Sequence, residues 1–277
     1  MTLLATALEL HAAGLSVVPV AADGTKRPRI AWKPHTDAAA DAAQLRAWFD
    51  NDLAQGIGIV TGFGDVELLE VEGAAMGQMG AVLELLDGTG LRHVYDRLVT
   101  GWSEQSPSGG LHLLYRVDGG AVPGNTKVAQ RPTDGATGRE TLAETRGTGG
   151  FVVLAPSAGG VHPTGRPWVR LVGGPATIPT ITREERDQVH AVVHAALDTM
   201  PDETPAPAGP VDAKWSTSFH AAEGDVTPGD DFEAKTDWSE ILVGWSHVFT
   251  RGATRYCRRS GKKDGISATT GHAGDRD

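Results

Sequence analysis

The chain contains two glutamates at the spacing that places both side chains on one face of a strand. Glu70 and Glu72 end the segment Val66–Glu72, whose composition is typical of a strand. Two carboxylates about 4 Å apart repel by about 4 kcal/mol at an effective dielectric constant near 20, so a cation, a shared proton or solvation must offset the repulsion. The pair is a candidate site for Mg²⁺ or Mn²⁺, which bind carboxylate oxygens. The alternative is an exposed strand face that carries Glu67, Glu70 and Glu72.

A second candidate is the segment before the strand that begins at Leu111. Ser108, Gly109 and Gly110 are small residues that let backbone N–H groups approach an anion closely. His112 lies just inside the strand, where its imidazole can reach a phosphate. The alternative is an ordinary glycine turn followed by a half-buried histidine. The sequence has no P-loop, dinucleotide-binding or nucleophile-elbow motif, so the corresponding classes of protein are not supported.

Two further segments carry charged groups that suit phosphate chemistry. Glu144 is a candidate third carboxylate, and Arg146 can donate charge-assisted hydrogen bonds to a phosphate. Alternatively, these two residues form a surface ion pair that contributes under about 1 kcal/mol to stability. The segment Lys26–Lys33 combines basic residues with Trp32, as in sites that hold a phosphate chain or a single strand. The alternative for that segment is a solvated loop.

The spacing of apolar residues predicts the elements that must position these candidates. Helices are expected at Thr2–Ala13, Ala38–Asn51, Ala75–Leu86, Leu91–Leu98 and, from a capping box, Thr182–Thr199. Strands are expected at Leu15–Val20, Gly56–Gly62, Val66–Glu72, Leu111–Val117 and Phe151–Ala155. Because strands and helices alternate irregularly, the pattern predicts a mixed α/β or α+β domain.

The character of the sequence changes after Met200. Residues 200–230 are acidic and contain five prolines, which predicts a linker. Residues 231–277 regain an apolar pattern that fits a short helix and a following strand, and six lysines and arginines lie between positions 251 and 263 without an acidic residue. Such a segment is too short to bury a core of its own. We therefore expect a domain over residues 1–199, followed by the linker and by part of a truncated module.

Composition limits the class of protein. Hydrophobic residues make up 40% of the chain and charged residues 22%, as in ordinary globular domains. A single cysteine excludes a disulfide framework and a multi-cysteine zinc site, and neither a secretory signal nor a membrane span is evident, so a soluble cytoplasmic protein is expected. The net charge of −10, from 25 basic and 35 acidic residues, excludes a uniformly basic DNA-coating protein. The net charge does not exclude an enzyme with a local, metal-assisted site.

The order of the motifs along the chain resembles a known family. The basic Lys26 segment, Gly56–Gly62, the paired carboxylates, Ser108–His112, the Glu144 segment and Phe151–Ser157 follow one another as in the N-terminal primase–polymerase (prim-pol) domain of phage and plasmid replication proteins, within the archaeo-eukaryotic primase superfamily. The resemblance covers about residues 3–172. It implies an α+β fold in which an N-terminal α/β module packs against an RRM-like module, with the active site between them.

The resemblance also implies roles for individual residues. Metal ligands correspond to Glu70, Glu72 and Glu144, and the nucleotide would be bound by Ser108, Gly109, Gly110, His112, Arg146 and Lys26. Glu70, Glu72, His112 and Glu144 form the implied catalytic set, with one or two Mg²⁺ or Mn²⁺ ions and no zinc. The family usually has aspartate at the first carboxylate, whereas this chain has Glu70. A displacement of about 1 Å can cost about 100-fold in rate, so the longer side chain is a departure with consequences.

The expected function is template-directed DNA synthesis by a replication protein of a phage or mobile element. Nucleotides would be transferred from a dNTP or NTP to a primer 3′-hydroxyl, and a helicase module would follow the linker in the full-length protein. Two alternatives remain open: a non-catalytic nucleotide- or DNA-binding module with a degenerate metal site, and a metal-dependent phosphodiesterase or nuclease.

Overall fold

The computed structural model describes residues 2–50, 55–119, 122–134, 138–201, 238–262 and 266–270. Contacts between residues divide the chain into two compact units. The larger unit comprises Met1–Asp87 and Leu91–Met200, and the smaller comprises Gly88–Gly90 and Pro201–Asp277. Every residue that the sequence singles out for metal or nucleotide binding lies in the larger unit.

Two sheets form the framework of the larger unit. The small sheet is antiparallel, in the order β1 (Ser16–Val20), β2 (Gly56–Thr61), β8 (Gly150–Leu154). The large sheet has the order β6 (Thr126–Pro132), β7 (Arg139–Arg146), β3 (Val66–Val71), β5 (Leu111–Asp118), β4 (Trp102–Gln105), β9 (Val169–Gly173). A further short strand, β10 (Thr180–Thr182), pairs in parallel with the end of β5. Because β2 leads into β3, β7 into β8 and β8 into β9, the chain crosses three times between the sheets.

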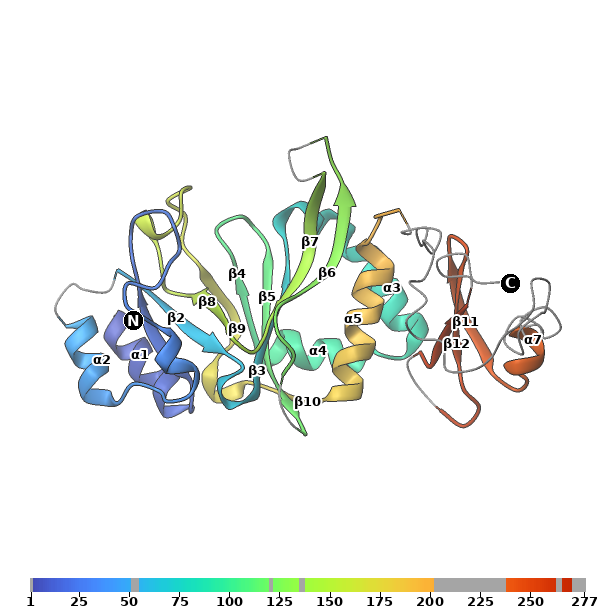
Figure 1. Ribbon diagram of the computed structural model, residues 1–277, viewed down its shortest axis with the longest axis horizontal. Helices are drawn as coiled ribbons and strands as arrows, with labels where there is room; N and C mark the ends of the chain where they lie inside the picture. The colour runs from blue at the N-terminus through green and yellow to red at the C-terminus, as the bar shows by residue number, and fades with distance from the viewer. Residues whose placement is uncertain are drawn as a thin grey trace, which may run out of the picture. The chain divides into compact units, whose positions relative to one another are not determined.

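Helices cover both sheets. Their bounds are α1 (Leu3–Ala12), α2 (Ala42–Phe49), α3 (Met79–Thr89), α4 (Arg92–Gly101) and α5 (Arg183–Leu197). Thr2, Asp41 and Thr182 each cap a helix by accepting a hydrogen bond from a backbone N–H of its first turn. Figure 1 shows α1 and α2 beside the small sheet, whereas α4 and α5 pack against strands of the large sheet.

One hydrophobic cluster joins the two sheets. Leu10 of α1, Leu45 of α2 and Ile57 of β2 pack in the same cluster as Leu68 of β3 and Trp102 of β4, and all five are at least nine-tenths buried. Burial of such side chains stabilises by roughly 1.5–3 kcal/mol each. The shared cluster fixes the position of one sheet against the other, which is the condition for a site built from residues of both.

The mixed α+β class predicted from the sequence is confirmed, and the arrangement agrees with a primase-like fold. The five predicted helices and five predicted strands are present with small shifts at their ends; the helix expected from Ala75 begins as a 3₁₀ turn, η3 (Gly73–Gln78), before α3. Among the described residues of the larger unit, five strands were not predicted: β4, β6, β7, β9 and β10. Their sequences are short or rich in polar residues, which carry little apolar periodicity.

The smaller unit contains an antiparallel sheet of its own. A short helix, α7 (Trp238–Ile241), precedes the strands β11 (Ser246–Arg251), β12 (Thr254–Arg258) and β13 (Ala268–Thr270), in that order in the sheet. Phe249 and Tyr256 stack across β11 and β12, with ring centroids 4.3 Å apart. The basic run that starts at Arg251 begins at the end of β11 and continues along β12. Apart from its first two residues, the predicted linker lies outside the described residues.

No helix in the described part of the chain combines the length and the apolar character that crossing a membrane requires.

Candidate active site

The two faces of β3 carry glutamates with different surroundings. Glu67 is fully buried on the face covered by α5, where Arg186 donates hydrogen bonds of 2.5 and 2.6 Å to its two oxygens. Glu70 projects to the opposite face, and Glu72, just past the end of β3, lies on that side too. The alternative of one exposed face bearing all three glutamates is therefore wrong, because residues three apart on a strand point in opposite directions.

Strand pairing extends Glu70 into a row of charged residues that crosses the whole large sheet. Directly paired positions on neighbouring strands project to the same face. From β9 to β6, the paired residues are Arg170, Glu104, His112, Glu70, Glu144 and Lys127. We call these six residues the charged row. Backbone pairing of six strands thus places three carboxylates, an imidazole and two cations side by side.

Three carboxylates converge at the middle of this row. One oxygen from each of Glu70, Glu72 and Glu144 lies within 4.8 Å of the other two. Glu144 is nearly inaccessible to solvent, with 4% of its side chain exposed, whereas Glu70 and Glu72 are partly exposed toward a cavity. Three oxygen ligands at this spacing suit a hard divalent cation such as Mg²⁺ or Mn²⁺.

The electrostatics of the cluster are uneven. Burial and the charges of Glu70 and Glu144 raise the pKa of Glu72 to about 7. Burial alone would raise the pKa of Glu70 as well, but the hydrogen bond and charge of His112 lower it below its ordinary value. Burial disfavours the charged form of His112, yet Glu70 and the nearby Glu104 raise the pKa of its imidazole. Near neutral pH, the negative charge of the three carboxylates therefore exceeds the positive charge of His112.

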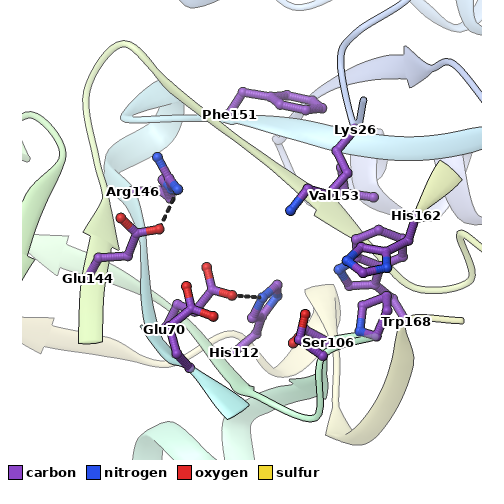
Figure 2. Close-up of a pocket in the computed structure, with 13 residues that line it drawn as sticks. Lys26, Glu70, Ser106, His112, Glu144, Arg146, Phe151, Val153, His162 and Trp168 are labelled. Atoms are coloured by element: carbon purple, nitrogen blue, oxygen red, sulfur yellow. Dashed lines mark hydrogen bonds and ion pairs between the residues drawn. The ribbon is translucent and has the colours of Figure 1, made fainter. Parts of the chain in front are cut away.

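Glu144 has cationic partners of its own. Lys127, from the adjacent strand β6, forms an ion pair with its carboxylate. Arg146, two residues along β7, forms a second (Figure 2). The predicted pairing of Glu144 with Arg146 is present, but its carboxylate is buried rather than at the surface. The carboxylate of Glu144 is thus neutralised by two cationic side chains of the protein, whereas the carboxylate of Glu72 has no such ion pair among the described residues.

The segment before His112 forms a tight turn. The backbone N–H of Gly109 donates to the carbonyl of Ser106 at 2.8 Å, and that of Gly110 donates to Ser106 Oγ at 3.1 Å. Gly109 has a φ of +86°, and a Cβ on Gly110 would lie 2.6 Å from the carbonyl oxygen of Val71. Both glycine N–H groups are therefore engaged within the turn. Of the three predicted residues Ser108, Gly109 and Gly110, Ser108 lines the cavity.

A cavity of about 250 Å³ lies over the carboxylates, between the two sheets. One side is formed by the three glutamates, His112, Arg146 and the turn at Ser106–Ser108. The other side comes from the N-terminal loop and from β8 and the segment after it. Its residues are Lys26, Phe151, Val153, His162 and Trp168 (Figure 2). The structure thus brings together the predicted residues Lys26, Glu70, Glu72, Ser108, His112, Glu144 and Arg146, with Gly109 and Gly110 shaping the turn beside them.

Sequence reasoning did not identify several residues of this region. Glu104 is fully buried; the indole N–H of Trp102 and the backbone N–H of Ala155 donate to its two oxygens at 3.0 and 2.8 Å. Since Ala155 follows β8, Glu104 links the large sheet to the small one beneath the cavity. Its only sequence signal was its position two residues before the Ser106 turn. Lys127 and His162 were likewise missed, because nothing local marks their place beside the cavity.

Comparison with known families supplies one match. Residues 7–182 match a family model described as "bifunctional DNA primase/polymerase, N-terminal". The matched region covers more than half of the chain and contains every residue that lines the cavity. Among curated proteins, none matches this chain.

Proposed function

The chain belongs to the bifunctional DNA primase/polymerase N-terminal family, and from this membership we propose that it is a metal-dependent nucleotidyltransferase that extends DNA on a template. The observation that carries the proposal is the convergence of three carboxylates in a cavity that two histidines, a lysine, an arginine and two serines also line. Phosphoryl transfer requires both kinds of group: anionic ligands for metal and cationic or N–H donors for phosphate.

The carboxylate cluster fits a divalent cation. Its donor atoms are all oxygens, and they lie close enough to share one ion or two. Burial and the charges of Glu70 and Glu144 raise the pKa of Glu72, and a bound cation would offset both effects. Glu70, Glu72 and Glu144 would hold Mg²⁺ or Mn²⁺. A bound ion would neutralise the charge that develops on the α-phosphate and on the leaving pyrophosphate.

The remaining residues are assigned to the nucleotide. His112 donates from Nε2 to Glu70 at 3.1 Å, so it orients a carboxylate of the cluster and keeps positive charge beside the cavity. Ser108 offers a hydroxyl at the cavity edge, and Lys26 and Arg146 offer cationic donors from opposite sides. These groups would position the triphosphate so that its α-phosphorus meets the primer 3′-hydroxyl.

The ion pairs of Glu144 imply a local exchange of partners. If the carboxylate of Glu144 binds a divalent cation, the cation competes with Lys127 and Arg146 for the same two oxygens, and we expect part of these contacts to be exchanged. Arg146 already lines the cavity, so its released N–H groups are available to a phosphate there. In this proposal the same side chain first neutralises Glu144 and then binds the substrate.

The test is primer extension with the whole chain. Primed and unprimed DNA templates are incubated with labelled dNTPs or NTPs and either Mg²⁺ or Mn²⁺. Extension is expected from the wild type, and Glu70→Ala with Glu72→Ala should abolish it, whereas Glu84→Ala, an exposed carboxylate on α3, should leave it unchanged. Absence of extension by the wild type, or full activity of the double variant, refutes the proposal.

The same assay, with calorimetric titration of dNTP and metal beside it, separates the alternatives. Binding of dNTP without incorporation indicates a non-catalytic module, and degradation of the DNA without incorporation indicates a nuclease. Replication of a phage or mobile element and a helicase module after the linker remain proposals that follow from the family resemblance, and a cytoplasmic location remains a proposal that follows from the composition.

A further inference from the structure

A second histidine, His162, lies on the cavity wall opposite the carboxylates. It follows the 3₁₀ turn η4 (Gly159–Val161) and lines the cavity together with Lys26 and Trp168 (Figure 2). Its ring meets that of Trp168 edge-on, with centroids 5.6 Å apart and an interplanar angle of 81°. Trp168 is itself 4% exposed, so the imidazole is held against a buried, immobile partner.

Hydrogen bonds determine which nitrogen of His162 carries the proton. The backbone N–H of Thr164 points at Nδ1 from 3.1 Å, and because a backbone N–H can only donate, Nδ1 must accept. The Thr164 hydroxyl lies 2.8 Å from the same nitrogen. Burial and the charge of Lys26 lower the pKa of His162, which favours the neutral ring. We therefore assign the proton to Nε2, which has no hydrogen-bond partner among the described residues.

The loop of His162 is fastened to the loop of Lys26. The backbone N–H of Gly24 donates to the carbonyl of Gly160 at 2.7 Å, and a Cβ on Gly160 would lie 2.7 Å from the carbonyl oxygen of Ala22. Lys26 itself has a φ of +60°, a left-handed conformation that is uncommon for lysine. The two loops therefore present an ammonium group and a ring N–H as one fixed unit across from the carboxylates.

The chemistry of this unit selects one part of a nucleotide. A cation beside a neutral N–H donor suits an anion, and a phosphate chain is the part that can reach both this unit and a metal ion on the opposite carboxylates. Aromatic faces suit the base, and Phe151 provides such a ring elsewhere on the same wall. At about 250 Å³ the cavity is smaller than sites that enclose a whole drug-sized ligand, so it suits the phosphates better than the complete nucleotide.

We propose that His162 is a nucleotide-binding residue whose Nε2–H donates a hydrogen bond to the triphosphate chain, next to Lys26. The inference rests on the proposed function for the identity of the ligand as a nucleotide. It adds a hydrogen-bond donor on the side of the cavity that the small sheet forms. One end of the triphosphate would then contact His162 and Lys26, and the other end would contact the metal ion held by the carboxylates of the large sheet.

Calorimetric titration of the whole chain with dATP, inorganic tripolyphosphate and deoxyadenosine, each with Mg²⁺, tests this proposal. His162→Phe keeps a flat ring against Trp168 but removes the donor, and should weaken dATP and tripolyphosphate about ten-fold or more, as expected for a hydrogen bond to a charged group. His162→Gln keeps an N–H₂ donor at similar reach and should recover most of the affinity. His35→Phe is the matched control, because His35 also meets a tryptophan edge-on but does not line the cavity.

The outcomes are distinct. Loss of dATP affinity without loss of tripolyphosphate affinity places the donor at the sugar or base and overturns the proposal, as does an unchanged affinity for both. Equal losses in His162→Phe and His162→Gln assign the effect to the ring rather than to the donor, which also overturns it. If His162→Phe fails to fold, His162→Gln and Lys26→Met decide the question by the same titrations. A wild type that binds dATP but extends no primer refutes the proposed function while leaving this inference intact.

Discussion

Replacement of Glu72 by glutamine should stabilise the metal-free protein at alkaline pH. In the wild type, burial and the charges of Glu70 and Glu144 raise the pKa of Glu72 from 4.5 to about 7. The folded state therefore binds more protons than the unfolded state between these two pH values, and stability falls as the pH rises through this window. Glutamine is neutral at every pH, so the variant does not suffer this loss.

The size of the effect follows from the pKa difference. At 1.36 kcal/mol per pH unit, the difference corresponds to about 3 kcal/mol at pH 8 as an upper bound. Glu72 is only partly buried, and solvent screens its repulsion from the other two carboxylates. We therefore expect the metal-free Glu72→Gln variant to be about 1–2 kcal/mol more stable than the wild type at pH 8, and no more stable near pH 4.5.

Urea unfolding in EDTA at several pH values between 4.5 and 8 measures this difference, with Glu84→Gln as a control for the change in net charge. Addition of Mn²⁺ should reverse the order, because the wild type keeps all three carboxylate ligands and gains more from binding. The reasoning is refuted if Glu72→Gln is no more stable than the wild type at pH 8 in EDTA, or if Glu84→Gln gives the same gain.

Three other predictions concern residues around the site. Glu67→Ala leaves the buried Arg186 with the exposed Asp187 in place of a buried partner, and should cost about 3 kcal/mol in urea unfolding; a loss below about 1 kcal/mol contradicts this. Lys127→Ala removes a cation from Glu144 and should tighten Mn²⁺ binding a few-fold in calorimetry, whereas Arg131→Ala, which removes the neighbouring exposed pair with Glu140, should not. Gly73→Ala would place a Cβ 2.1 Å from the carbonyl oxygen of Ser108 and should weaken dNTP binding; Gly77→Ala, in the same 3₁₀ turn but with open space around it, should behave as the wild type.

Local sequence was sufficient for part of the site. The i, i+2 spacing of Glu70 and Glu72 after an apolar run placed both carboxylates on one side of a strand, and the structure has them there. The turn between Ser106 and Gly110 was expected from its small residues, but the engagement of the glycine N–H groups by Ser106 was not. Side-chain hydrogen bonds within a turn depend on its exact conformation, which residue types alone do not fix.

The partners of these carboxylates depended on strand pairing. β7 has the sequence Arg-Glu-Thr-Leu-Ala-Glu-Thr-Arg, and glutamate and alanine are depleted in strands, so its sequence gave no clear strand signal. It forms a strand because β3 and β6 pair with it on either side. That pairing alone brings Glu144 opposite Glu70, about seventy residues away in the chain, and Lys127 opposite Glu144.

The sequence by itself determined the mixed α+β class, most of the helices and buried strands, and the order of motifs that marks the family. These features are local, because the periodicity of apolar residues in a helix or strand, and the residue that caps a helix, can be recognised within a short segment of sequence. Tertiary structure decided the charged row, the buried Glu104 between the sheets and the place of His162 across from the carboxylates. Register between strands and contact between loops are set by packing over the whole domain, so no short segment of sequence specifies them.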